Sequence, residues 1–153
     1  MGTTRMNAEV KIDDFTISVV PSTMIDLIWD KVKPHLEKVS DKSDDFTIES
    51  TYNRLINGDS MLLTVSRGAE VIAVNTVHIE VLSSGIKTLY IGLVGGDELD
   101  IWSRQMLQFI EAIAKDYGCT ELRGMVVRKG WLKKMQPYGW SEAFTTVRYK
   151  IGE

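Results

Sequence analysis

Three carboxylates stand in the first turn of a predicted helix that follows directly on a strand and a double glycine. The stretch reads "YIGLVGGDELDIWSRQML", and its acids are Asp97, Glu98 and Asp100. A strand, a glycine turn and a helix N-terminus present backbone N–H groups and a positive dipole end, which suit a phosphate. The acids oppose this use, because they stabilise the helix dipole themselves and repel a phosphate. We therefore expect a helix start that is capped by the chain's own carboxylates.

A pair of reactive side chains, His78 and Glu80, lies on an earlier predicted strand. Their spacing of two places them on one face of the strand, where Glu80 could tune His78 as a general base. A partly exposed pair at a sheet edge is the alternative, and we favour it. The two histidines and the lone Cys119 show no metal-ligand spacing, so we expect no metal site and a buried Cys119 thiol.

Basic and aromatic residues are interleaved near the C-terminus, and no acid interrupts the run from Arg123 to Gln136. Such a surface can bind an acidic protein or a nucleic acid. A solvated helix face is the alternative interpretation, since the basic residues are few. The candidate partner-binding residues are Arg128, Lys129, Trp131, Lys133, Tyr138 and Trp140.

Length and composition predict one globular domain. The chain has 153 residues, of which 44% are hydrophobic and 25% charged, which is enough for a sizeable core. We expect a polar N-terminal arm at 1–14 and a single domain at 15–153. The net charge of −3 argues against a global basic field. The sequence shows no secretory leader and no apolar run near the ~20 residues of a membrane span, so we expect a soluble, cytoplasmic protein.

Hydrophobic periodicity predicts the elements that hold these residues. The N-terminal half predicts a strand at 15–20, a helix over 22–39 that Pro34 kinks or breaks, and a short helix that ends at Gly58. Three strands then form an antiparallel meander, and an amphipathic helix leads to a strand parallel to the last of the three. The predicted ranges are 60–67, 70–84 and 86–94 for the meander, 99–117 for the helix, 120–128 for the parallel strand, 129–136 for a short helix, and 141–152 for a last strand.

This order of elements resembles the Gcn5-related N-acetyltransferase (GNAT) fold from about Phe15 to Ile151. Its most specific part is "WLKKMQPYGWSEAFTTVRYKI", where a short helix leads to Gly139-Trp140 and then to an alternating strand. The chain is also similar to small GNAT-like proteins of tailed bacteriophages. The resemblance implies an α/β (α+β) fold whose central mixed, mostly antiparallel sheet is flanked by helices.

The chain departs from the pattern of active family members at three positions. Such members carry Q/R-x-x-G-x-G/A before the long helix to hold the pyrophosphate of coenzyme A, where this chain reads "LVGGDELD". Their general acid is a Tyr four residues before the glycine of Gly-aromatic, a place that Met135 occupies here. Their general base is often a Glu on a central strand, and "IKTLYIGLV" has none, which leaves Glu80 and His78.

These departures predict a non-catalytic protein without a cofactor, and the resemblance to phage proteins implies a phage-encoded virion or assembly component. It would lie in the host cytoplasm or the virion and bind a protein partner or its own copies, with nucleic acid as a further candidate and no membrane. The alternative is an acetyl-CoA-dependent N-acetyltransferase acting on a protein or a small-molecule amine. In that interpretation Glu80 or His78 is the base, and backbone amides around Val94, Gly95 and Gly96 bind acetyl-CoA and polarise the thioester carbonyl.

Overall fold

A six-stranded sheet in the order β1-β2-β3-β4-β5-β6 forms the centre of the molecule. The computed structural model describes residues 9–41, 45–125 and 129–152. Neighbouring strands are antiparallel except β5 and β6, which are parallel. The predicted α/β class, the meander and the parallel strand are therefore confirmed. The strands are β1 (Glu9–Ile12), β2 (Phe15–Val20), β3 (Met61–Arg67), β4 (Glu70–Val81), β5 (Lys87–Gly96) and β6 (Glu121–Gly124).

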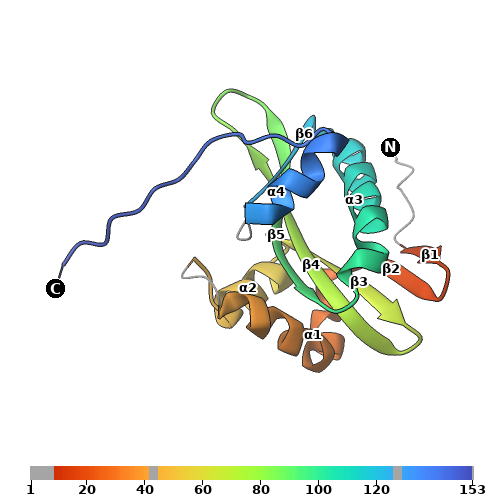
Figure 1. Cartoon of the computed structure of the whole chain (residues 1–153). Helices are drawn as coiled ribbons and strands as arrows, with labels where there is room; N and C mark the ends of the chain where they lie inside the picture. Colours follow the sequence, from red (N-terminus) through yellow and green to blue (C-terminus); the bar gives the residue numbers. More distant parts are fainter. Residues whose placement is uncertain (1–8, 42–44, 126–128, 153) are drawn as a thin grey trace.

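Helices cover both faces of the sheet (Figure 1). Two helices pack on one face and α3 packs on the other, and a short helix, α4, follows β6. Each face has its own hydrophobic core, since side chains alternate along a strand. Trp102 and Ile110 of α3 are buried in one core, and Val32 and Leu36 of α1 in the other. The helices are α1 (Ile25–Ser40), α2 (Ile48–Ile56), α3 (Leu99–Asp116) and α4 (Lys129–Met135), with 3-10 turns at η1 (Ser22–Met24) and η2 (Gln136–Tyr138).

Helix α1 is not broken at Pro34, where a kink or break was predicted. Pro34 lies on the exposed side of the helix, so water can satisfy the carbonyl that loses its backbone hydrogen bond. The apolar spacing of this helix predicts a buried face made of Met24, Leu27, Ile28, Val32, Leu36 and Val39. That face is confirmed for Val32 and Leu36, which are buried, but not for Leu27, which is 72% exposed, and Ile25 is buried as well.

The two ends of the chain differ from the sequence prediction. Residues 9–12 of the predicted arm form β1, which pairs with β2. The strand predicted at 141–152 is wrong, because residues 140–152 form neither helix nor strand, and the end of this segment runs away from the body of the protein (Figure 1). Alternating apolar residues favour a strand but cannot supply the neighbouring strand that it needs.

Within the described residues, no helix is both long and apolar enough to cross a membrane.

Candidate functional site

Strands β5 and β6 stop pairing about halfway along β5. Their pairing ends at Ile91 and Gly124, and β5 continues to Gly96 with only β4 as its neighbour among the described residues. A bulge between β4 and β5 lies at the same point, where the Leu93 N–H donates to Oγ1 of Thr76 at 2.9 Å. Bulges re-aim the backbone and are frequent beside active sites. The second half of β5 thus presents an open edge that leads to the N-terminus of α3.

The glycines at the end of β5 have a structural explanation. A Cβ atom on Gly95 would lie 2.4 Å from the carbonyl oxygen of His35 in α1. One on Gly96 would lie 2.4 Å from Cα of Ala73 in β4, and the φ of Gly96 is +136°. Close packing therefore requires both glycines whether or not a ligand binds. Val94 beside them is 37% exposed, and the acetyl-CoA role expected of Val94, Gly95 and Gly96 stays a prediction.

The prediction that the acids at the start of α3 cap the helix is wrong for Glu98. Its carboxylate makes no capping hydrogen bond and instead accepts two hydrogen bonds from the Arg67 guanidinium, at 2.8 and 2.9 Å. Arg67 holds the pKa of Glu98 below its usual value and also donates to Asp14 at 2.9 Å. The backbone carbonyl of Asp97 accepts from the Trp102 indole at 2.7 Å. One of the three negative charges is therefore neutralised within the protein.

A row of candidate functional side chains crosses strands β4, β5 and β6. His78 on β4 is directly opposite Tyr90 on β5, and Tyr90 is opposite Arg123 on β6. The rings of His78 and Tyr90 stack with centroids 5.2 Å apart. Glu80 lies beside them, with its Oε2 3.7 Å from Nε2 of His78. These side chains share the sheet face of α1 and α2, since their strand neighbours, among them Val77, face α3.

The environment of the row keeps both ring side chains uncharged near neutral pH. Burial and then the charge of Arg54 hold the pKa of His78 below its usual value of 6.5, although Glu80 opposes the shift. Burial and then the charge of Glu80 raise the pKa of Tyr90 above its usual 10, and Arg123 opposes this shift. A neutral imidazole can accept a proton and a neutral phenol can donate one, so the row contains a candidate base and a candidate acid side by side.

His78 and Glu80 are predicted as candidate site residues from the sequence, whereas Tyr90 and Arg123 are not. Tyr90 was visible only as one residue of an alternating strand, and Arg123 was grouped with the basic run. Their place beside His78 depends on the register of β4, β5 and β6, which the sequence does not specify.

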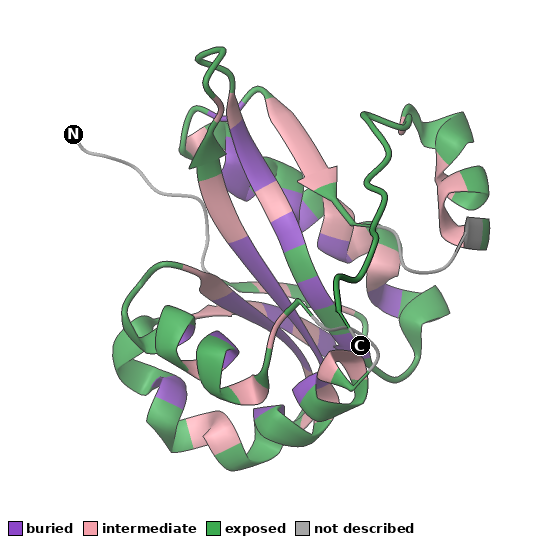
Figure 2. Cartoon of the chain, turned by 90° about the vertical axis from the view of Figure 1, so that its left-hand side faces the viewer, coloured by how far each residue is buried: buried purple, intermediate pink, exposed green. Residues whose placement is uncertain are grey.

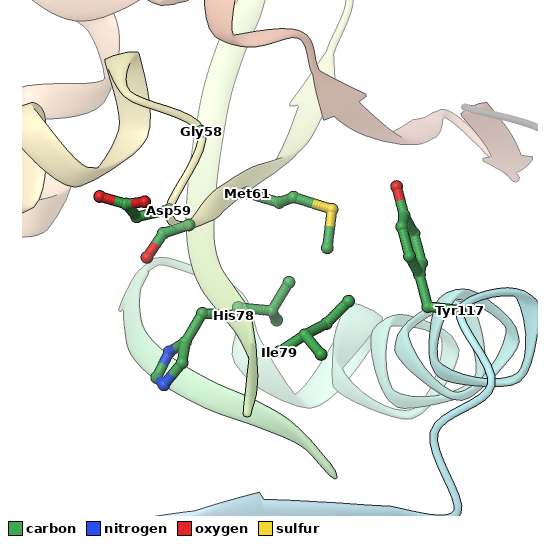
Figure 3. Close-up of a pocket in the computed structure, with 8 residues that line it drawn as sticks. Gly58, Asp59, Met61, His78, Ile79 and Tyr117 are labelled. Atoms are coloured by element: carbon green, nitrogen blue, oxygen red, sulfur yellow. The ribbon is translucent and has the colours of Figure 1, made fainter. Parts of the chain in front are cut away.

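A small pocket of about 220 Å³ lies next to His78 (Figure 3). The His78 ring points away from the part of the pocket where Met61, Ile79 and Tyr117 face one another. The pocket is smaller than the roughly 300 Å³ at which ligand pockets begin, and Tyr117 places it at the C-terminal end of α3. We assign it no ligand. Its lining consists of Gly58, Asp59, Ser60, Met61, Val77, His78, Ile79 and Tyr117.

The aromatic residues predicted to bind a partner largely contact the protein itself. Trp131 and Trp140 meet edge to face with ring centroids 5.6 Å apart, and Trp140 packs against the core under α3. Tyr138 is 68% exposed and lies 6.0 Å from the Arg104 guanidinium. The Lys133 side chain is exposed. Arg128 and the Lys129 side chain lie outside what the structure describes, and the role of the whole set stays a prediction.

The described residues contain no group of three or more His, Cys, Asp or Glu side chains placed to hold a metal ion. Cys119 is buried, as predicted, and burial raises the pKa of its thiol.

Comparisons with known proteins give matches at the level of structure. No protein-family model matches the chain. No curated protein matches its sequence either. An aminoglycoside acetyltransferase from an uncultured soil metagenomic sample superposes with a TM-score of 0.68 at 12% identity, over 93% of this chain and 100% of the other. A ribosomal-protein-alanine N-acetyltransferase from Brucella melitensis biovar Abortus 2308 gives 0.67 at 8% identity, over 90% and 99%. The aminoglycoside N-acetyltransferase AAC(6')-Iy in complex with CoA gives 0.64 at 12% identity, over 90% and 94%.

These matches establish that the chain has a GNAT-like fold, as predicted. They contradict the prediction of a non-catalytic virion or assembly component. The three matched structures are acetyltransferases, and the match covers 94% or more of each of their chains. The error has a physical cause. Three acids oppose a phosphate in the sequence, but Arg67 pairs with one of them in the structure, and Tyr90, a candidate proton donor, stacks on His78. The resemblance to phage proteins stays a prediction.

Proposed function

We propose that this chain is an N-acetyltransferase that transfers the acetyl group of acetyl-CoA to an amine. The observation that carries the proposal is the open edge of β5, which runs from the row of His78 and Tyr90 to the N-terminus of α3. The likeness to acetyltransferases, one of them in complex with CoA, supports it.

The end of the open edge suits the pyrophosphate of the coenzyme. Backbone N–H groups and the dipole of α3 favour an anion there. The Glu98 carboxylate does not cap these N–H groups, because it pairs with Arg67. Strand β5 from Gly96 back to Tyr90 spans six residue steps, or about 20 Å of extended chain. A coenzyme held at α3 would therefore extend along β5 toward the His78–Tyr90 row.

Acetyl transfer to an amine requires two proton movements besides the exchange of bonds at the acetyl carbon. Acetyl-CoA supplies the acetyl group as a thioester, and the attacking nitrogen must lose a proton while the departing sulfur gains one. His78 accepts the first proton at its imidazole, because its lowered pKa keeps it neutral at pH 7. Tyr90 donates the second from its hydroxyl, because its raised pKa keeps it protonated. Glu80 orients and stabilises the imidazolium that forms on His78.

A thiol-release assay tests the proposal. The protein is mixed with acetyl-CoA and with amine acceptors of the two kinds that its structural neighbours' names suggest, an aminoglycoside and a peptide with an N-terminal alanine. We expect release of free CoA only when an acceptor is present. Tyr90→Phe, which keeps the ring that stacks on His78 but removes the proton donor, should lower kcat about 100-fold. A Tyr90→Phe rate equal to that of the unmodified protein would remove Tyr90 from the mechanism.

A further inference from the structure

A bulge interrupts the pairing of β4 and β5 between the two halves of the candidate site. At this point one residue of β4, Thr76, stands opposite two residues of β5, Gly92 and Leu93. The extra residue of a bulge is left out of the main-chain ladder, and here Oγ1 of Thr76 accepts the Leu93 N–H at 2.9 Å. Thr76 is 6% exposed, so its hydroxyl makes this contact inside the protein.

The same hydroxyl explains why residue 92 is a glycine. A Cβ atom on Gly92 would lie 2.6 Å from Oγ1 of Thr76, and its next nearest neighbour, the Thr76 carbonyl oxygen, would be 3.4 Å away. The φ of Gly92 lies outside the left-handed region, so its backbone conformation does not itself require glycine. The Thr76 hydroxyl and the space left at Gly92 therefore form one fitted contact.

The packing of the two cores maintains the bulge. Buried residues gather along the central strands of the sheet (Figure 2). Before the bulge, Leu89 and Ile91 of β5 belong to the core under α3, whereas Leu93 after it belongs to the core under α1. One extra residue thus reverses the two faces of β5. Regular pairing would turn Leu93 away from its core, so loss of the Thr76 hydroxyl should loosen the bulge and leave the fold in place.

The bulge also sets how the two halves of the site are aligned. Tyr90 of the His78–Tyr90 row lies before the bulge on β5, and Gly96 at the approach to α3 lies after it. Beyond Ile91, β5 no longer pairs with β6. Because a bulge bends its strand and increases the local twist, this one fixes the direction in which the open edge leaves the row.

We propose that Thr76 is a positioning residue for acetyl transfer. Its hydroxyl fixes the Leu93 amide and thereby the direction of the open edge, so that a coenzyme lying along β5 presents its acetyl group to His78 and Tyr90. Thr76 is buried and acts through the backbone of β5. This inference rests on the proposed acetyltransferase function. It assigns Thr76 an effect on the rate and not on the affinity for the coenzyme, because the end of the edge at α3 stays as it is.

The kcat of Thr76→Val, compared with its Kd for acetyl-CoA, tests this role. Valine keeps the shape of threonine but cannot accept the Leu93 N–H. A misplacement of about 1 Å costs on the order of 100-fold in rate, so we expect kcat in the thiol-release assay to fall about 100-fold. Calorimetry should give an unchanged Kd. Thr76→Ser keeps the hydroxyl and should have the unmodified kcat. The matched control is Thr64→Val, the same substitution at a buried threonine of β3, which should leave kcat unchanged.

Amide hydrogen exchange follows the contact directly and needs no substrate. The Leu93 N–H should exchange slowly in the unmodified protein and in Thr76→Ser, and faster in Thr76→Val. Gly92→Ala leaves Thr76 unchanged but places a methyl group against its hydroxyl. It should therefore show the same fast exchange and the same loss of kcat, with an unchanged Kd.

The outcomes separate this inference from the proposed function. A folded Thr76→Val with the unmodified kcat would overturn the inference and leave the proposed function standing, and so would a variant that changes Kd alone or an equal loss of kcat in Thr64→Val. If Thr76→Val does not fold, Gly92→Ala decides, and an unmodified kcat in that variant overturns the inference. An unmodified protein that neither binds acetyl-CoA nor releases thiol would overturn the proposed function, and this inference with it.

Discussion

Replacing His78 by Gln is expected to lower kcat/KM for acetyl transfer about 1000-fold, the middle of the range for losing a general base. Glutamine keeps a polar side chain beside Tyr90 but cannot accept a proton. The folded state should change little, because His78 is only partly buried and its ion-pair contact with Glu80 is 3.7 Å long. The thiol-release assay measures the loss. A variant within threefold of the unmodified rate would exclude His78 as the base.

The pH dependence of kcat/KM is a control for the assignment of His78 as the base. A base works only when unprotonated, so the rate should fall with decreasing pH through a pKa that lies below 6.5. Arg54→Gln removes a positive charge that lowers the pKa of His78, so this acid limb should move to higher pH. Glu80→Gln removes a negative charge that raises the pKa of His78, so the acid limb should move to lower pH. An acid limb that neither variant moves would mean that another group titrates.

Gly95→Ala is expected to destabilise the fold by about 3 kcal/mol, the upper part of the range for overpacking a well-filled interior. The new methyl group would lie 2.4 Å from the His35 carbonyl oxygen and 2.8 Å from a methyl of Val39. The first contact is with backbone, so α1 must move away from β5. Thermal unfolding should show a midpoint lowered by roughly 6–12 °C.

Gly130→Ala is the matched control for that substitution. Gly130 lies in helix α4, and a Cβ atom there would meet nothing within 4 Å. Alanine is the better helix former, so stability should be unchanged or rise by up to about 1 kcal/mol. Equal losses in the two variants would show that crowding at Gly95 is not the cause.

The sequence predicts most of the sheet and the long helix, because their patterns are local. Trp102, Met106 and Ile110 recur at helical spacing, and the structure buries all three in α3. The two hairpins of the meander are likewise predicted by short turns at Gly68 and Gly85 between alternating segments.

The candidate site is harder to predict, because it depends on contacts between distant segments. Glu98 is 31 residues from Arg67, and nothing in the local pattern pairs them. Tyr90 becomes a neighbour of His78 only through the register of two strands. The strand predicted at 141–152 fails for a related reason, since a strand needs a neighbour that the local pattern of a segment cannot specify.

Calorimetric titration of the full chain with acetyl-CoA tests whether this chain binds the coenzyme, and it requires neither the correct acceptor nor an active base. We expect saturable binding with a Kd between about 1 and 100 µM, within the usual range of substrate affinities. Arg67→Gln should weaken it, since Glu98 would then face the coenzyme phosphates without its partner. The absence of saturable binding at acetyl-CoA concentrations of about 1 mM, the upper end of that range, would contradict the claim that this chain is an acetyltransferase.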